Sequence, residues 1–220
     1  MRFAVLISGK GTNLQAIIDS VKKGEIKAEL ALVISSTPKA LGLQRAKEAG
    51  IKTAVFNPKD YTNKQSVDRD MLILLKQEKI DFIVLAGYMR ILTPFFIKHY
   101  PRKIFNIHPS LLPSFKGTEG IKDALTYGVK VTGVTVHFVD EKMDHGPIIL
   151  QEALRIHPED SLSSLEAKIH NIEHRLYSKA IALFVDGRLK VKGRRVEILE
   201  KPEPKKDHNP QPEPIQQPQT

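Results

Sequence analysis

Short apolar runs alternate with stretches of helical periodicity along the first half of the chain. Phe3 to Ile7 and Phe82 to Ala86 are uninterrupted apolar runs, as expected of strands buried on both faces of a parallel sheet. Between them, the apolar positions of residues 14–21 follow the i, i+3, i+4, i+7 spacing of an amphipathic helix. Further strands are predicted at 30–34, 53–56 and 104–108, and further helices at 40–49 and 67–75. This order predicts an α/β fold, a Rossmann-like, mostly parallel twisted sheet with helices on both faces.

The pattern changes to period two between Val131 and Val139. Such alternation predicts an antiparallel or edge strand, followed by a returning strand at 148–151. His137 falls on the more polar face of this strand and is expected to be a surface residue. Ser163 and Glu166 have the spacing of a capping box, and helical periodicity then continues to Gly187.

The segment from residue 188 to the end of the sequence carries two further features. Arg188 to Leu199 is predicted to form a small hairpin that turns at Lys192-Gly193, away from the core. From Lys201 the composition shifts, because six of the fourteen prolines of the chain lie between there and Thr220. We expect residues 200–220 to be a disordered, Pro/Gln-rich tail, since so few apolar residues cannot form a core.

Composition narrows the classes of chemistry. The 220 residues include no cysteine, which excludes thiol nucleophiles, disulfides and thiolate metal sites. Phe3 to Ile7 is too short for a signal peptide or a membrane span, so a soluble, cytoplasmic protein without membrane contact is expected. The net charge of +9 could favour nucleic acid, but the densest basic cluster, Arg188 to Arg195, has no interleaved aromatic residues. We therefore expect small-molecule substrates and no nucleic acid.

A glycine-containing loop, Ser8 to Asn13, lies between the first strand and the first helix. Glycine permits close backbone approach, and a helix N-terminus offers free N–H groups and a partial positive charge. This combination favours a phosphate or carboxylate site, although an ordinary strand-to-helix turn has the same order. A dinucleotide site fits poorly, because Leu14 replaces the third glycine of that motif.

The segment from Asn106 to Pro113 places two polar residues at the end of a predicted strand. Asn106 and His108 are two positions apart, so they share a face at a Cα separation of roughly 6.5–7 Å. Pro109 ends the strand because it has no N–H. Polar pairs at the carboxyl ends of parallel strands are typical of binding sites, while a strand cap and a turn remain the structural alternative.

An acidic loop ending at Asp144 is a third polar feature. A carboxylate near His108 would favour the imidazolium form, and an imidazolium beside the Asn106 amide suits an oxyanion. No convincing serine or cysteine nucleophile accompanies these residues. The pattern therefore indicates direct attack by one substrate on another, with help in proton transfer.

Several of these segments together resemble a known family. The segments are Ser8-Gly-Lys-Gly-Thr-Asn13, Leu85 to Leu92, Asn106-Ile-His-Pro-Ser-Leu-Leu-Pro113, Val134 to Val139, and Asp144-His-Gly-Pro-Ile148. The third is similar to the motif of folate-dependent formyltransferases in general, and the first is similar to that of the phosphoribosylglycinamide formyltransferases. The resemblance runs from Arg2 to about Val191.

The resemblance implies a function and a domain organisation. It implies transfer of a formyl group from 10-formyltetrahydrofolate, as co-substrate, to the amine of glycinamide ribonucleotide in purine biosynthesis. It also implies no metal, a monomer or homodimer, and one formyltransferase domain at residues 1–199. Within that domain, residues 1–100 would be the nucleotide-binding half and residues 101–190 the catalytic and folate-binding half.

The resemblance also implies roles for individual residues. The catalytic residues would be Asn106, His108 and Asp144. The glycinamide ribonucleotide site would comprise Gly11, Thr12, Asn13, His170 and Glu173; from helical spacing alone, His170 and Glu173 would be solvated. The folate site would comprise Lys64, Met89, Arg90, Ile91, Leu92, Asn106, Asp140, Glu141, Lys142, Met143 and Asp144. Lys64 stands where relatives often carry an arginine that contacts the folate tail.

Three rival functions remain open at this stage. Methionyl-tRNA formyltransferase would use the basic charge, but it has a second, RNA-contacting domain for which we expect no room after Gly187. Formyltetrahydrofolate deformylase carries an additional N-terminal domain, whereas this sequence begins at its first predicted strand. A non-catalytic folate- or nucleotide-binding protein would not require Asn106, His108 and Asp144 together.

Overall fold

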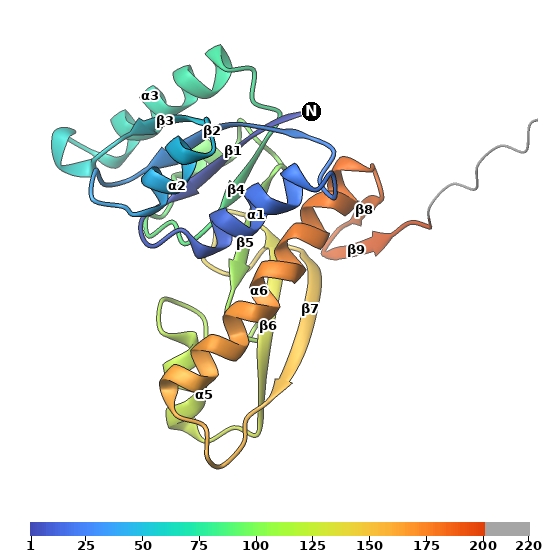
Figure 1. Cartoon of the computed structure of the whole chain (residues 1–220). Helices are drawn as coiled ribbons and strands as arrows, with labels where there is room; N and C mark the ends of the chain where they lie inside the picture. The colour runs from blue at the N-terminus through green and yellow to red at the C-terminus, as the bar shows by residue number, and fades with distance from the viewer. Residues whose placement is uncertain (201–220) are drawn as a thin grey trace, which may run out of the picture.

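A seven-stranded sheet forms the centre of the computed structural model, which describes residues 1–200 (Figure 1). Its strand order is β3-β2-β1-β4-β5-β6-β7. Strands β1 to β5 pair in parallel and β6 and β7 pair antiparallel, which confirms the predicted fold class. The strands are β1 (Arg2–Ile7), β2 (Glu29–Ser35), β3 (Lys52–Val55), β4 (Phe82–Leu85), β5 (Ile104–His108), β6 (Val131–Phe138) and β7 (Ile148–Arg155). The tail predicted at 200–220 lies outside the described residues from 201 onward.

Helices cover both faces of the sheet. The α-helices are α1 (Thr12–Lys22), α2 (Gly42–Glu48), α3 (Lys64–Gln77), α4 (Pro94–Ile97), α5 (Gly120–Tyr127) and α6 (Leu162–Val185), and a 3-10 turn, η1, spans Pro58–Asp60. Helices α1, α2, α5 and α6 contribute to the core on one face, and α3 and α4 to the core on the other. Among residues 1–200, no helix has both the length and the apolar character needed to cross a membrane.

Strand β1 shows why these apolar runs form central strands. Phe3, Val5 and Ile7 pack into one core, whereas Ala4 and Leu6 pack into the other, and all five are fully buried. Because successive side chains of a strand point to opposite faces, only a continuous apolar run can fill two cores at once.

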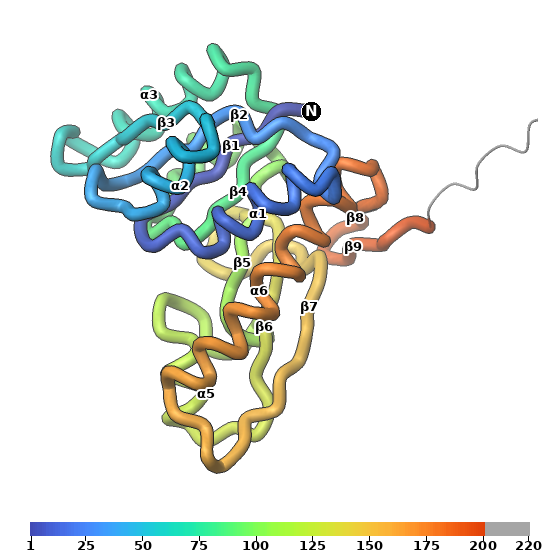
Figure 2. Tube along the Cα trace, viewed as in Figure 1, coloured from blue at the N-terminus to red at the C-terminus, as the bar shows by residue number. Residues whose placement is uncertain are grey.

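Helix α6 packs against α1, α5, β6 and β7. Figure 2 shows it running alongside β6 and β7 and ending close to the small hairpin of β8 (Leu189–Lys192) and β9 (Arg195–Ile198). From this helix, the buried hydroxyl of Tyr177 lies 2.8 Å from the carbonyl oxygen of Leu85 and 3.1 Å from that of Phe105. The phenol therefore fixes α6 against the strands that end at the site.

Two local predictions were wrong in detail. The residue that caps α6 is Ser161, whose hydroxyl accepts from the Ser164 N–H at 3.2 Å, and the predicted box of Ser163 and Glu166 is not used. Strand β6 is antiparallel, which is one of the two predicted alternatives, and it lies inside the sheet between β5 and β7. The predicted hairpin is confirmed, but it does not point away from the core, because Val191 and Val196 pack against the core.

Candidate active site

The end of β5 and the opposite positions of β6 form the floor of the site. Asn106 is paired across the two antiparallel strands with His137, and His108 with Thr135. Residues directly opposite in such a pair place their side chains on the same face, close together. The predicted pair of Asn106 and His108 thus becomes a group of four polar side chains.

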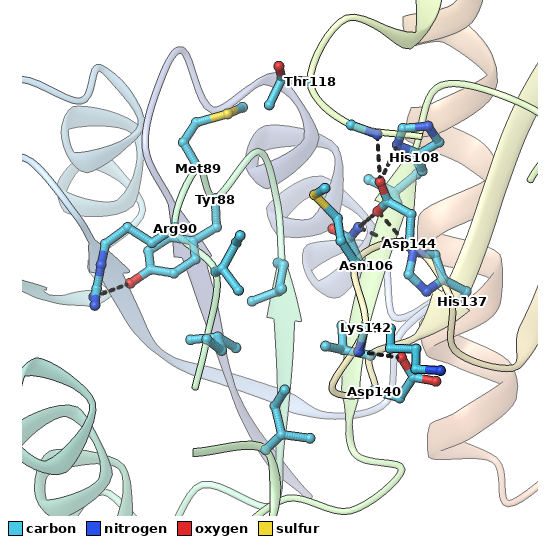
Figure 3. Close-up of a pocket in the computed structure, with 18 of the residues that line it drawn as sticks. Tyr88, Met89, Arg90, Asn106, His108, Thr118, His137, Asp140, Lys142 and Asp144 are labelled. Atoms are coloured by element: carbon cyan, nitrogen blue, oxygen red, sulfur yellow. Dashed lines mark hydrogen bonds and ion pairs between the residues drawn. The ribbon is translucent and has the colours of Figure 1, made fainter. Parts of the chain in front are cut away.

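The Asp144 carboxylate lies among three of these side chains, those of Asn106, His108 and His137 (Figure 3). Its Oδ2 is 3.6 Å from His108 Nδ1 and accepts a hydrogen bond from the Gly117 N–H at 2.9 Å. Its Oδ1 is 3.4 Å from Asn106 Nδ2 and 3.8 Å from His137 Nε2. The three residues singled out as catalytic from the sequence therefore lie together, although 36 positions of chain separate His108 from Asp144.

The two ring nitrogens of His108 face two different oxygen acceptors. Nε2 lies 2.7 Å from the carbonyl oxygen of Phe115, which can only accept, so Nε2 carries a proton. Nδ1 faces the carboxylate of Asp144, which also accepts only when ionised. Protonation of Nδ1 would turn its 3.6 Å contact with Asp144 Oδ2 into an ion pair.

His137 was predicted to be a surface residue, and that prediction was wrong: its exposed fraction is 2%. Burial lowers the pKa of His137, so the ring is neutral at pH 7. Its Nδ1 donates to the carbonyl oxygen of Phe138 at 2.8 Å, which leaves Nε2 to accept from Asn106 Nδ2 at 3.3 Å. A neutral imidazole therefore helps to set the orientation of the Asn106 amide.

Thr135 was not singled out from the sequence, and it supports the segment that follows His108. Its buried hydroxyl donates to the carbonyl oxygen of Ser110 at 2.7 Å and accepts from the Leu112 N–H at 3.1 Å. Gln151 on β7 donates to the same hydroxyl at 2.9 Å. The alternation on β6, combined with antiparallel pairing to β5, is the sequence signal that could have identified Thr135 and His137.

The loop that carries Asp144 is held in a tight backbone conformation. Asp144 has a positive φ of 47°, a region that aspartate tolerates better than most residues. Two positions later, a Cβ on Gly146 would overlap the carbonyl group of Phe138. The Asp-His-Gly order therefore lets the loop close tightly over the end of β6.

A cavity of about 290 Å³ opens beside these residues, and its rim is apolar. Met89, Ile91 and Met143 line it and are more than half exposed. Nearly all predicted folate-site residues line this cavity, namely Met89, Arg90, Ile91, Leu92, Asn106, Asp140, Glu141, Lys142, Met143 and Asp144. An apolar mouth with a polar wall suits a flat heterocycle whose reactive group points inward.

Two predicted folate-site residues lie differently. The side chain of Arg90 turns away from the cavity, as Figure 3 shows, and donates to the Tyr88 hydroxyl at 3.1 Å and to the buried Asp68 carboxylate at 3.4 Å. Lys64 is exposed in the first turn of α3 and is not among the residues that line the cavity. A contact between Lys64 and a folate tail stays a prediction.

A second cluster of polar side chains, Asn13, His170 and Glu173, connects the start of α1 to α6. Asn13 Nδ2 donates to Glu173 Oε2 at 3.1 Å, and His170 Nδ1 lies 2.9 Å from the same oxygen. Glu173 is only 4% exposed, so the reading from helical spacing alone that it is solvated was wrong. The bond to Glu173 raises the pKa of His170.

The loop itself has the backbone geometry of an anion site. Gly11 precedes α1 with a φ of +73°, and no side chain of the described residues caps the helix. The first N–H groups, at Thr12 and Asn13, therefore face outward from the helix end. A Cβ on Gly11 would lie 2.6 Å from the Cα of Gly42, which leaves room for glycine only. All five residues predicted for the ribonucleotide site thus lie in one group. Among the described residues, no cluster of His, Cys, Asp or Glu could hold a metal ion.

Comparison with known proteins gives matches along nearly the whole chain. The formyl transferase family model matches residues 1–181. The phosphoribosylglycinamide formyltransferase of Haemophilus influenzae is 47% identical over 191 residues, which are 87% of this chain and 90% of that protein. The trifunctional purine biosynthetic protein adenosine-3 of Drosophila melanogaster is 46% identical over 188 residues, which are 84% of this chain and 14% of that longer protein. The crystal structure of glycinamide ribonucleotide transformylase 1 from Symbiobacterium toebii has a TM-score of 0.89 at 46% identity, covering 91% of this chain and 94% of that one.

Proposed function

We propose a function for this chain from its family, the formyl transferases, and within it the phosphoribosylglycinamide formyltransferases, to which the chain belongs. It catalyses the reaction of that group by direct transfer of a formyl group between two bound substrates. The donor is 10-formyltetrahydrofolate and the acceptor is the amine of glycinamide ribonucleotide. The products are formylglycinamide ribonucleotide and tetrahydrofolate, as required in purine biosynthesis.

The cavity beside Asn106 is the proposed donor site. Its exposed apolar rim of Met89, Ile91 and Met143 supports binding of the flat pterin and aryl rings of a folate. The polar wall carries Asn106 and His108, so a folate seated in the cavity would bring its formyl group to that wall.

The group formed by the loop after β1 and α6 is the proposed acceptor site. The free N–H groups at Thr12 and Asn13 favour a phosphate, since a helix N-terminus combines donors with partial positive charge. Glu173, fixed by Asn13 and His170, offers carboxylate oxygens to ribose hydroxyls. These contacts would leave the glycinamide amine free to reach the formyl carbon.

The chemical step needs no covalent bond to the protein. The amine nitrogen forms a bond to the formyl carbon, and the carbonyl electron pair moves to the oxygen. The tetrahedral oxyanion then collapses, the bond to N10 of the folate breaks, and one proton passes in total from the attacking amine to N10. Holding both substrates in place supplies much of the acceleration.

Asn106, His108 and Asp144 would stabilise the oxyanion and handle the proton. The imidazolium of His108 places positive charge at the cavity wall, and the Asp144 carboxylate balances that charge 3.6 Å away. The Asn106 contacts to His137 and Asp144, at 3.3 and 3.4 Å, are long, and the formyl oxygen can replace one of them as the acceptor. The convergence of these three residues on one cavity wall carries the proposal.

A competition assay tests the choice of acceptor. The protein is given 10-formyltetrahydrofolate together with glycinamide ribonucleotide, methionyl initiator tRNA and water, and the fate of the formyl group is measured. We expect formylglycinamide ribonucleotide to be the main product. A main product of formylated tRNA or free formate would contradict the proposal and would indicate the tRNA transferase or the deformylase reaction instead.

A further inference from the structure

The small C-terminal hairpin reaches back to the loop that lines the cavity. Its turn residue, Arg194, donates from Nη2 to the carbonyl oxygen of His145 at 2.7 Å. From the same guanidinium, Nη1 lies 3.2 Å from His145 Nε2. The hairpin follows residue 181, where the match to the family model ends.

The contact continues from His145 into the cavity wall. His145 Nδ1 lies 2.7 Å from Asp140 Oδ2, and a carboxylate accepts, so Nδ1 carries the proton of that bond. Nε2 is then free to accept from Arg194 when the ring is neutral. Asp140 Oδ1 in turn accepts from the Lys142 N–H at 3.0 Å. A chain of hydrogen bonds thus runs from Arg194 through His145 to Asp140, which lines the cavity.

The β8–β9 hairpin is itself fixed by hydrogen bonds at its open end and by packing against the rest of the protein. At its open end, Arg188 Nε donates to the carbonyl oxygen of Leu199 at 2.8 Å, and the Leu199 N–H donates to the carbonyl oxygen of Arg188. Val191 and Val196 pack against the main core. Arg194 therefore extends from a fixed element.

Arg194 bonds to the backbone of His145, the residue that follows Asp144. Because the peptide carbonyl of His145 is tied to Arg194, the backbone immediately after Asp144 cannot shift without breaking that bond. A charge-assisted hydrogen bond of this kind is about twice as strong as a neutral one. The loop from Asp140 to Asp144 supplies a large part of the cavity wall, so its position determines the shape of the donor site.

We propose that Arg194 is a positioning residue for the donor site: it fixes the loop from Asp140 to His145 in the shape that receives the folate. The inference rests on the proposed function for the identity of the donor. Arg194 does not touch the reacting atoms and acts through His145 and Asp140. Through Arg194, the hairpin thus contributes to the structure of the donor site.

Steady-state kinetics of Arg194→Ala, with Arg195→Ala as the matched control, test the proposal. Arg195 is the exposed neighbour, and within residues 1–200 its side chain makes no hydrogen bond or ion pair. We expect Arg194→Ala to raise KM for 10-formyltetrahydrofolate about tenfold, as for loss of one charged hydrogen bond. KM for glycinamide ribonucleotide should stay within about twofold, because that site lies on α1 and α6. Arg194→Lys should recover part of the loss, since lysine can still donate to a carbonyl.

A readout without substrates separates this inference from the proposed function. Amide hydrogen exchange at Lys142 reports whether the loop is held, and it should be faster in Arg194→Ala than in wild type and in Arg195→Ala. If exchange and donor KM are the same in the two alanine variants, the inference is wrong. Equal rises in both KM values together with a lower Tm would also overturn it, because they would indicate general destabilisation. A wild-type protein without transfer activity would contradict the proposed function, and the exchange result would still decide whether Arg194 holds the loop.

Discussion

Asn13 and Glu173 are 160 positions apart in the chain, and a hydrogen bond of 3.1 Å joins their side chains. Asn13 belongs to the first turn of α1, and Glu173 to the middle of α6. The bond holds the anion-binding loop against the buried carboxylate, so the two halves of the proposed acceptor site form one unit.

Replacing this amide by a carboxylate should weaken acceptor binding. In Asn13→Asp, two carboxylates would face each other, and the new negative charge would oppose a phosphate at the helix end. We expect KM for glycinamide ribonucleotide to rise about tenfold or more, with little change in KM for the folate donor. Asn63→Asp is the matched control, because Asn63 caps α3, where aspartate is an equally good cap. An unchanged acceptor KM would place the phosphate elsewhere.

The pH dependence of stability should report the bond between His170 and Glu173. Because this bond raises the pKa of His170 in the folded chain, its stabilisation is fully present below the unfolded value of about 6.5. It is lost as the pH rises through the raised folded value. The difference in Tm between wild type and His170→Gln should therefore be largest near pH 5.5 and should shrink by pH 9.

A control for this pH series is His157→Gln, at an exposed position whose side chain has no hydrogen bond within residues 1–200. Its Tm should follow that of the wild type at every pH. A Tm difference for His170→Gln that stays constant from pH 5.5 to 9 would show that the ionised pair does not contribute.

The phenol of Tyr177 should contribute measurably to stability. Burial raises the pKa of Tyr177 well above its usual value, so the hydroxyl stays protonated and can donate to the carbonyl oxygens of Leu85 in β4 and Phe105 in β5. Tyr177→Phe leaves these buried oxygens without that donor, at a cost of about 1–3 kcal/mol in the free energy of unfolding. Denaturant unfolding measures this cost, and Tyr127→Phe, 79% exposed, is the control expected to change nothing. Equal values for the two variants would contradict the role of Tyr177.

Periodicity was enough to predict the sheet, its helices and the position of the strand-end pair. Continuous apolar runs such as Phe3 to Ile7 have few alternatives to a buried parallel strand, and a residue spacing of two places Asn106 and His108 on one face. The acidic loop ending at Asp144 was noted from the sequence as a third polar feature. Its role beside His108 came from the resemblance to a known family, because no local pattern reveals which acid a histidine meets 36 positions later.

What could not be predicted depends on neighbours in space. His137 was taken for a surface residue because period two also fits an exposed strand, whereas β6 has a partner on each side and is covered. Glu173 was taken for a solvated residue because helical spacing does not show that α1 packs beside it. In both cases burial arises from tertiary contacts, which place a polar residue in a network that the local pattern does not show.

The histidine at the cavity wall should be essential for the rate. His108→Ala removes the imidazole and its Nε2 bond to Phe115, so we expect kcat to fall about 100-fold or more. His99→Ala is the control, since His99 is exposed and, within residues 1–200, its ring bonds only to the carbonyl oxygen of Phe95. Turnover that is equal in both variants would remove His108 from the mechanism.

The most direct test is the single-turnover rate of formyl transfer by Asp144→Asn, with both substrates saturating. Asparagine keeps the size of the side chain but removes the carboxylate charge that lies 3.6 Å from His108 Nδ1. Asp123→Asn, at an exposed position of α5, is the control. We predict that Asp144→Asn slows the chemical step about 100-fold or more. A single-turnover rate within about twofold of the wild type would contradict the assignment of Asn106, His108 and Asp144 as the catalytic group.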